Sequence, residues 1–237
     1  MHSTEVICLD ILEFRNTYWN YYLQLENDFF SYSPYCEIDT VNDKAFSVKY
    51  LQLLLSLCGE IDSICKTFCK LLDETLDLKK AGINDYIPIL CSCYPTFSNE
   101  TVEICGYKYR ELQPWKSIEK GHVPNWWQRY NAIKHHRDQK TNGIENYKYA
   151  NQKNVAEALC ALYILVEYWA AKNFVISEED AFKQKGNDPN EHTMSRLKSD
   201  RLNMIKWTFY ESFMGQEPWF APKQFHKYLK GSVCKDE

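Results

Sequence analysis

One short segment of this sequence concentrates side chains that could act on a phosphodiester. It starts with two tryptophans and ends in a basic cluster: Trp126-Trp127-Gln128-Arg129-Tyr130-Asn131-Ala132-Ile133-Lys134-His135-His136-Arg137. Histidine titrates near neutral pH and can donate or accept a proton, whereas arginine stays charged and holds phosphate through a planar fork of donors. The segment therefore contains the residue types needed to bind a phosphodiester and to move a proton at neutral pH.

Positive charge gathers around this segment. The chain has 28 basic and 32 acidic residues, a net charge of −4, yet residues 105–153 contain ten Lys or Arg against four Asp or Glu. Such a local excess attracts anionic partners. A solvated basic loop and hairpin would give the same count, so both interpretations remain open.

Helical spacing distributes the cluster over one helix, which we expect to follow Pro124-Asn125 and to run to about residue 139. At 100° per residue, the face expected to meet the core carries Trp126, Tyr130, Ile133 and Arg137. Arg129 and His136 then lie along one flank, and Asn131 and His135 lie on the opposite side. Each polar edge of the helix thus has one histidine.

The rest of the chain predicts the elements that must position this helix. Few glycines and prolines, 8 of each, and apolar residues at helical spacing indicate a mainly α-helical bundle. Four further helices are expected, over residues 5–31, 46–78, 83–93 and 151–174. Alternation around Gly106 predicts a small β-hairpin insertion at about 100–118, and Asn142-Gly143 predicts a tight turn.

The composition changes after residue 176. Residues 177–190 are polar and predict an exposed linker, and one more helix is expected around 194–213. We therefore divide the chain into a bundle, residues 1–176, and a C-terminal extension, residues 177–237. The extension either packs on the bundle or serves a partner.

The sequence also predicts the compartment and the absence of cofactors. The N-terminus lacks the features of a secretory signal, and no apolar run reaches about 18 residues, which predicts a cytoplasmic protein without a membrane span. Among the 10 cysteines, Cys65 and Cys69 are four residues apart and Cys91 is close to Cys93. No second pair or spaced histidine pair accompanies them, so we expect core packing, with no metal and no cofactor.

The motif resembles that of the HEPN superfamily, in which an Arg precedes a His by a few residues near the start of a helix in a four- or five-helix bundle. Five residues separate Arg129 from His135, and six separate it from His136. The fuller pattern, Trp-Trp-x-x-Tyr-Asn-x-x-Lys-His-x-Arg with a further helix after Asn151, is similar to uncharacterised bacterial proteins of that type. The resemblance covers roughly residues 5–174.

This resemblance implies RNA binding or metal-independent RNA cleavage, often by two copies of the motif across a homodimer cleft. His135 or His136 would transfer the proton, and Arg129 would neutralise charge on the phosphoryl oxygens. The residues expected to contact RNA are Trp127, Tyr130, Asn131, Lys134 and Arg137. For the Trp-Trp pair, packing in the core is the alternative. The resemblance further implies a bacterial defence or toxin role, with an antitoxin or defence-system protein as partner.

The motif departs from the superfamily at one position, because Tyr130 follows Arg129 where catalytic members carry a small polar residue. If the true signature is Asn131-x-x-Lys134-His135-x-Arg137, then Arg129 does not have the role of the superfamily's arginine. In that case either Arg137 has that role or no residue has it. The alternative function is therefore a catalytically inactive interaction or dimerisation module. In that interpretation Asn131 and His135 brace the neighbouring backbone and the hairpin.

Glu60 is a candidate supporting acid. It falls within the broad apolar face of the helix predicted over 46–78, where an unpaired carboxylate is costly to bury. We expect a partner such as Arg129, Lys134 or a motif histidine, which would orient the imidazole and raise its pKa. A position at the helix edge, in water, is the alternative.

Overall fold

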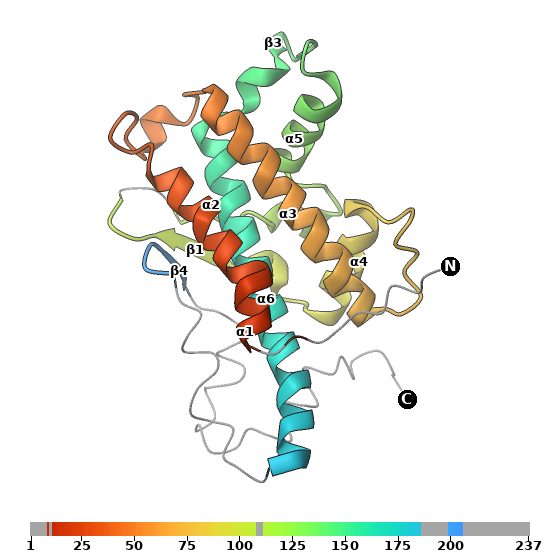
Figure 1. The fold of residues 1–237 in the computed structure, drawn as a ribbon. Helices are drawn as coiled ribbons and strands as arrows, with labels where there is room; N and C mark the ends of the chain where they lie inside the picture. Colours follow the sequence, from red (N-terminus) through yellow and green to blue (C-terminus); the bar gives the residue numbers. More distant parts are fainter. Residues whose placement is uncertain (1–8, 10, 108–110, 186–198, 206–237) are drawn as a thin grey trace.

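The computed structural model describes residues 9, 11–107, 111–185 and 199–205, and it is mainly helical (Figure 1). This confirms the predicted fold class at its coarser level. Beyond the helices named below, the chain forms 3-10 turns at Thr40–Asn42, Phe97–Asn99, Lys116–Lys120 and Asn146–Tyr149, the last of which is η5.

The apolar spacing predicted two long helices in the first part of the chain, and in the structure α2 (Asn20–Phe30) and α3 (Val48–Leu72) form there and pack side by side (Figure 1). Helix α1 (Ile11–Phe14) continues through a π-helical turn (Arg15–Trp19) into α2. Residues 5–8 and 10 of the predicted helix lie outside the described residues. Helix α3 begins at Ser47, whose side chain accepts a hydrogen bond from the Tyr50 amide at 3.0 Å.

Helix α3 ends six residues earlier than the predicted Leu78. Asp73 leaves the helical conformation, and its carboxylate accepts hydrogen bonds from the Thr75 amide at 2.9 Å and the Thr75 hydroxyl at 2.6 Å. Such a local side-chain turn competes with the helical ladder. The ammonium group of Lys70, in the last turn of α3, donates a hydrogen bond to the Leu76 carbonyl at 2.9 Å and so stabilises this turn. Helix α4 (Ile83–Cys93) then has the predicted bounds.

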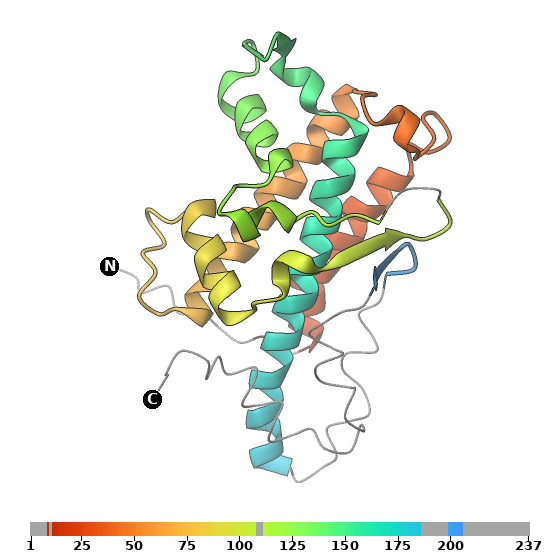
Figure 2. The same ribbon diagram turned by 180° about the vertical axis from the view of Figure 1, so that it is seen from behind.

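Helix α6 (Gln152–Lys185) forms the centre of the bundle. It lies between the α2–α3 pair and the segment that runs from β1 to the 3-10 turn at Lys116–Lys120, as the two opposite views show (Figures 1 and 2). Its first half is buried all round, which is typical of a central helix. The part from Gln152 to Lys172 is long and apolar enough to cross a membrane, but 94% of that window is buried inside the protein.

The helix also continues through Lys185, beyond the predicted end at 174 and into the segment predicted as a linker. Its last turns extend past the bundle (Figure 1). The proposed division at residue 176 therefore falls within one helix, and the roles of the two parts stay a prediction.

The predicted hairpin at about 100–118 is only partly correct. Strand β1 (Thr101–Ile104) pairs antiparallel with β4 (Leu202–Ile205), so its main partner comes from the C-terminal extension. The predicted second strand, after Gly106, contributes one β-bridge among the described residues, between Leu112 and Val102. Val102, Ile104 and Leu202 are buried, so one face of this small sheet is apolar and packs on the core.

Residues 199–205 of the extension pack on the bundle. Ser199 donates a hydrogen bond to the buried Glu26 carboxylate, and Arg201 lies over the Phe30 ring with 4.9 Å between the guanidinium carbon and the ring centroid. Because Leu202–Ile205 is a strand, the helix predicted over 194–213 is wrong for these residues. Residues 194–198 and 206–213 of that prediction lie outside the described residues.

Candidate functional site

The motif forms helix α5 (Asn125–His136), whose first half anchors it in the core. Trp126 is only 1% exposed and donates from its indole nitrogen to the Pro114 carbonyl at 2.9 Å. Its ring packs edge-on against Trp115, with 5.2 Å between centroids. Trp115 in turn donates to the Ala161 carbonyl of α6 at 3.2 Å, so α5 is fixed to the central helix through two indoles.

Trp127 and Tyr130 are buried as well, each with 5% of its surface exposed. Their rings pack together with centroids 5.1 Å apart, and Trp127 also contacts Trp126. A base can stack only on a ring face that solvent reaches. The predicted stacking role of Trp127 and Tyr130 is therefore corrected to packing between α5 and the rest of the bundle.

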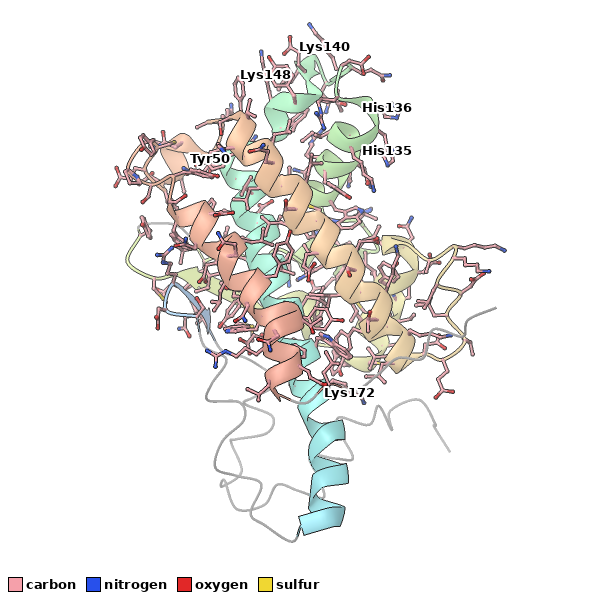
Figure 3. All side chains as sticks on the ribbon, viewed as in Figure 1. Tyr50, His135, His136, Lys140, Lys148 and Lys172 are labelled. Atoms are coloured by element: carbon pink, nitrogen blue, oxygen red, sulfur yellow. The ribbon has the colours of Figure 1, made fainter. Side chains whose placement is uncertain are left out.

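The last turn of α5 is solvent-exposed and positively charged. Lys134, His135, His136 and Arg137, which we call the basic end of α5, are all exposed, and the imidazole centroids of the two histidines are 6.3 Å apart (Figure 3). Arg137 was predicted on the core face, but α5 ends there as its C-cap. No acidic group among residues 9, 11–107, 111–185 and 199–205 forms an ion pair with these four side chains.

A small hairpin folds back on this end. Strands β2 (Lys140–Thr141) and β3 (Ile144–Glu145) pair around Asn142-Gly143, as the sequence predicted. Asn142 and Gly143 both have positive φ, 52° and 78°. A two-residue hairpin turn of type I′ requires positive φ at both of these positions. The hairpin leads into η5 (Asn146–Tyr149), which lies against α5.

Asn146 holds the hairpin to the helix. It is 2% exposed, and its amide nitrogen donates to the His136 carbonyl at 2.6 Å and the Ala132 carbonyl at 3.5 Å. Its amide oxygen accepts from the Thr141 hydroxyl at 2.7 Å. The last carbonyls of a helix have no partner within the helix, so Asn146 closes the end of α5.

The bracing predicted for Asn131 and His135 thus comes from Asn146. His135 is exposed, Asn131 is half-buried, and neither side chain forms a hydrogen bond among the described residues. Sequence reasoning used the Asn142-Gly143 turn and missed the Asn146 amide.

Arg129 lies apart from the histidines. Its guanidinium carbon is 4.0 Å from the centroid of the Tyr149 ring, and the Tyr149 hydroxyl donates to the Thr141 carbonyl at 2.7 Å. The guanidinium is half-buried, and none of its N–H groups donates a hydrogen bond within the described part of the chain. An arginine stacked on a ring keeps its in-plane donors for other partners.

Glu60 does not form the predicted ion pair with α5. No ion pair of the described residues includes it, and burial raises the pKa of its half-buried carboxyl above the usual value. The Lys134 ammonium lies instead over the Tyr130 ring, 5.3 Å from its centroid. Burial raises the pKa of the nearby Cys58 thiol, and the positive charge of Lys134 opposes that effect.

Four of the eight described cysteines lie in the core, and the other four are half-buried. Cys58, Cys65, Cys69 and Cys160 are buried, and burial raises the pKa of each thiol. Within the described ranges, no group of three His, Cys, Asp or Glu side chains is arranged to hold a metal ion.

No family model, no curated protein and no solved structure matches this chain.

Proposed function

We propose that this protein is a HEPN-like RNA-binding protein that holds the phosphate backbone of RNA on the basic end of α5. The observation that carries this proposal is the exposed run Lys134–Arg137, whose side chains form no ion pair with an acidic group among the described residues, although Asp138 follows it in the sequence. Phosphate contacts by lysine and arginine dominate affinity for nucleic acid. The HEPN resemblance supports RNA as the polyanion.

A purely structural role for these charges is the alternative. Basic side chains in the last turn of a helix interact favourably with the helix dipole, and α5 carries Lys134, His135 and His136 there. That role needs one or two charges close to the helix axis. It does not account for four adjacent basic residues, all open to solvent and continued by Lys140.

The test is RNA binding measured by fluorescence anisotropy with a labelled RNA 12-mer over a series of salt concentrations. Lys134→Ala/Arg137→Ala removes two phosphate contacts. We expect affinity at low salt to fall by roughly tenfold or more. The slope of log K against log salt should decrease by about 1.4, because each contact with a single strand contributes about 0.7.

A matched control removes the same charge elsewhere. Lys79 and Lys80 are exposed in the loop after α3, and Lys79→Ala/Lys80→Ala changes the net charge equally. We expect this control to retain most of the wild-type affinity and the same salt slope. Equal losses in both double variants would show that binding depends only on net charge, and no detectable binding by the wild type would end the proposal.

A second candidate function, metal-independent cleavage of RNA, is favoured by the exposure of both motif histidines. In such a reaction the 2′-oxygen attacks the adjacent phosphorus and the 5′-oxygen leaves, which gives a 2′,3′-cyclic phosphate and a 5′-hydroxyl. One imidazole takes the 2′ proton and an imidazolium supplies the proton of the leaving oxygen. His136 shares a flank of α5 with Arg129, whose guanidinium is held at Tyr149. As the HEPN resemblance implies, we propose that two copies of the motif meet across a homodimer cleft to form the complete site.

The cleavage proposal is tested with mixed RNA oligonucleotides in excess EDTA, with wild type compared with His135→Ala, His136→Ala and Arg129→Ala. Cyclic phosphate ends that disappear in one histidine variant would support it. Light scattering reports the dimer on the same samples. Absence of cleavage with intact RNA binding would leave the interaction module as the function.

A further inference from the structure

A second cluster of exposed side chains lies next to the basic end of α5. Phe46, in the segment before α3, is 46% exposed, and Tyr147 of η5 is 41% exposed. Their rings contact edge to face, with centroids 5.8 Å apart and an interplanar angle of 75°. The Lys148 ammonium lies 5.7 Å from the Phe46 centroid and 5.8 Å from the Tyr147 centroid. We call these three residues the aromatic platform.

Both rings of the platform are held by fixed backbone. Phe46 forms an isolated β-bridge with Asn151, and the Ala45 carbonyl accepts from the Gln152 amide at 2.9 Å. Tyr147 follows Asn146 directly, and the Asn146 side chain is bonded to the end of α5. Two segments about a hundred residues apart in sequence therefore present an aromatic pair at a defined place.

The platform and the basic end belong to one side of the molecule. Lys148, Lys140, His136 and His135 all project from the same end of the bundle (Figure 3). Glu145 lies between two of these cations, 3.4 Å from the Lys140 ammonium and 3.0 Å from the Lys148 ammonium. One carboxylate against two lysines leaves a net positive charge between the platform and α5.

We propose that the aromatic platform stacks an unpaired base of single-stranded RNA whose phosphates lie on the basic end of α5; this inference rests on the proposed RNA binding. An edge-to-face pair leaves at least one ring with a face that the other does not cover. Unpaired bases stack on such rings whatever their sequence. Bases inside a duplex are already stacked and paired, so the platform selects single strands over double strands.

The stacking residues are therefore Phe46 and Tyr147, and not the two rings of α5 that the motif suggested. Lys148 lies near both rings and shares Glu145 with Lys140, so the two lysines together leave one net positive charge for the phosphate of the stacked nucleotide. The platform has no sequence selectivity of its own, because every base offers a similar face to a ring.

The experiment measures affinity for a single-stranded RNA 12-mer and for a 12-base-pair RNA duplex, with wild type, Phe46→Ala and Tyr147→Ala. We expect each variant to bind the single strand about 5- to 100-fold more weakly. Affinity for the duplex and the salt slope should change little, since no phosphate contact is lost. Tyr21→Ala is the matched control, because Tyr21 is also 41% exposed but lies on α2. Thermal unfolding of each variant reports whether the fold is retained.

The outcomes separate this inference from the proposed function. Equal affinity of wild type, Phe46→Ala and Tyr147→Ala for the single strand, while Lys134→Ala/Arg137→Ala still weakens binding, overturns the platform and leaves RNA binding by α5 in place. Equal weakening for the duplex and the single strand also overturns it. If the wild type binds neither RNA, both proposals fail together.

Discussion

The centre of the bundle and the end that carries the candidate site are stabilised in different ways. Helix α6 is buried at every position from Val155 to Ala171 except Glu157, and most of these side chains are apolar. The end formed by the last turn of α5, the β2–β3 hairpin and η5 exposes most of its charged groups and depends on hydrogen bonds from Asn146 and Tyr149. Apolar burial fixes where α5 lies, and a few polar contacts fix where its basic side chains point.

The largest effect should come from the residue that joins these two regions. Trp126→Ala removes a fully buried indole and its bond to Pro114, which should cost about 3–5 kcal/mol of unfolding free energy. Urea denaturation followed by circular dichroism measures it. His136→Ala is the control on the same helix and should change stability by less than about 0.5 kcal/mol. A loss below about 1 kcal/mol for Trp126→Ala would mean that α5 is not anchored by its indoles.

A buried carboxyl makes the stability of the central helix depend on pH. Burial raises the pKa of Glu167 from the ordinary value of 4.5 to about 8, and its Oε1 has no hydrogen-bond partner among the described residues. The folded protein then keeps a proton that the unfolded chain releases above pH 4.5. The free energy of unfolding should therefore fall as pH rises from about 4.5 to 8, by at most about 1.4 kcal/mol per pH unit for one proton.

Glu167→Gln tests this origin of the pH dependence. We expect similar urea midpoints for variant and wild type at pH 5, and a higher midpoint for the variant at pH 8. The slope should become shallower without vanishing, since burial also raises the pKa of Glu60 and Glu157. Parallel pH profiles of wild type and variant would assign the dependence to other groups.

The sequence predicted the elements whose signals are local. Helix α4 has its predicted bounds, α5 begins one residue before its predicted start and ends three residues before its predicted end, and the Asn142-Gly143 turn joins β2 to β3. Each rests on a pattern within about a dozen residues, such as helical spacing or a turn dipeptide. The partner of β1 was not predictable in this way, because Leu202–Ile205 lies about a hundred residues further along the chain.

The candidate site shows the same limit. The exposure of His135 and His136 follows from helical spacing once one face of α5 is buried. Spacing did not predict that Trp127 would be buried beside Trp126, because α5 packs against more than one neighbour. It also did not bring Phe46 to Tyr147, since their contact depends on the bridge between Phe46 and Asn151.

The smallest effect on stability should be the most informative about the site. Asn146→Ala removes the donor to the His136 and Ala132 carbonyls and leaves the Thr141 hydroxyl without its acceptor. We expect a loss of about 1–3 kcal/mol, smaller than that of Trp126→Ala, because no large apolar group is uncovered. Hydrogen exchange should become faster in residues 137–149 and stay unchanged in α6, since the core does not depend on this amide.

Asn203→Ala, an exposed asparagine on β4, is the control for loss of an amide alone. If Asn146→Ala accelerates exchange in α6 as much as in the hairpin, the two regions form one cooperative unit and the contrast between them is lost. If exchange rises only in the hairpin and RNA affinity falls with it, the basic side chains need a fixed helix end to act together. Positioning by a single buried amide would then be as important for binding as the charges themselves.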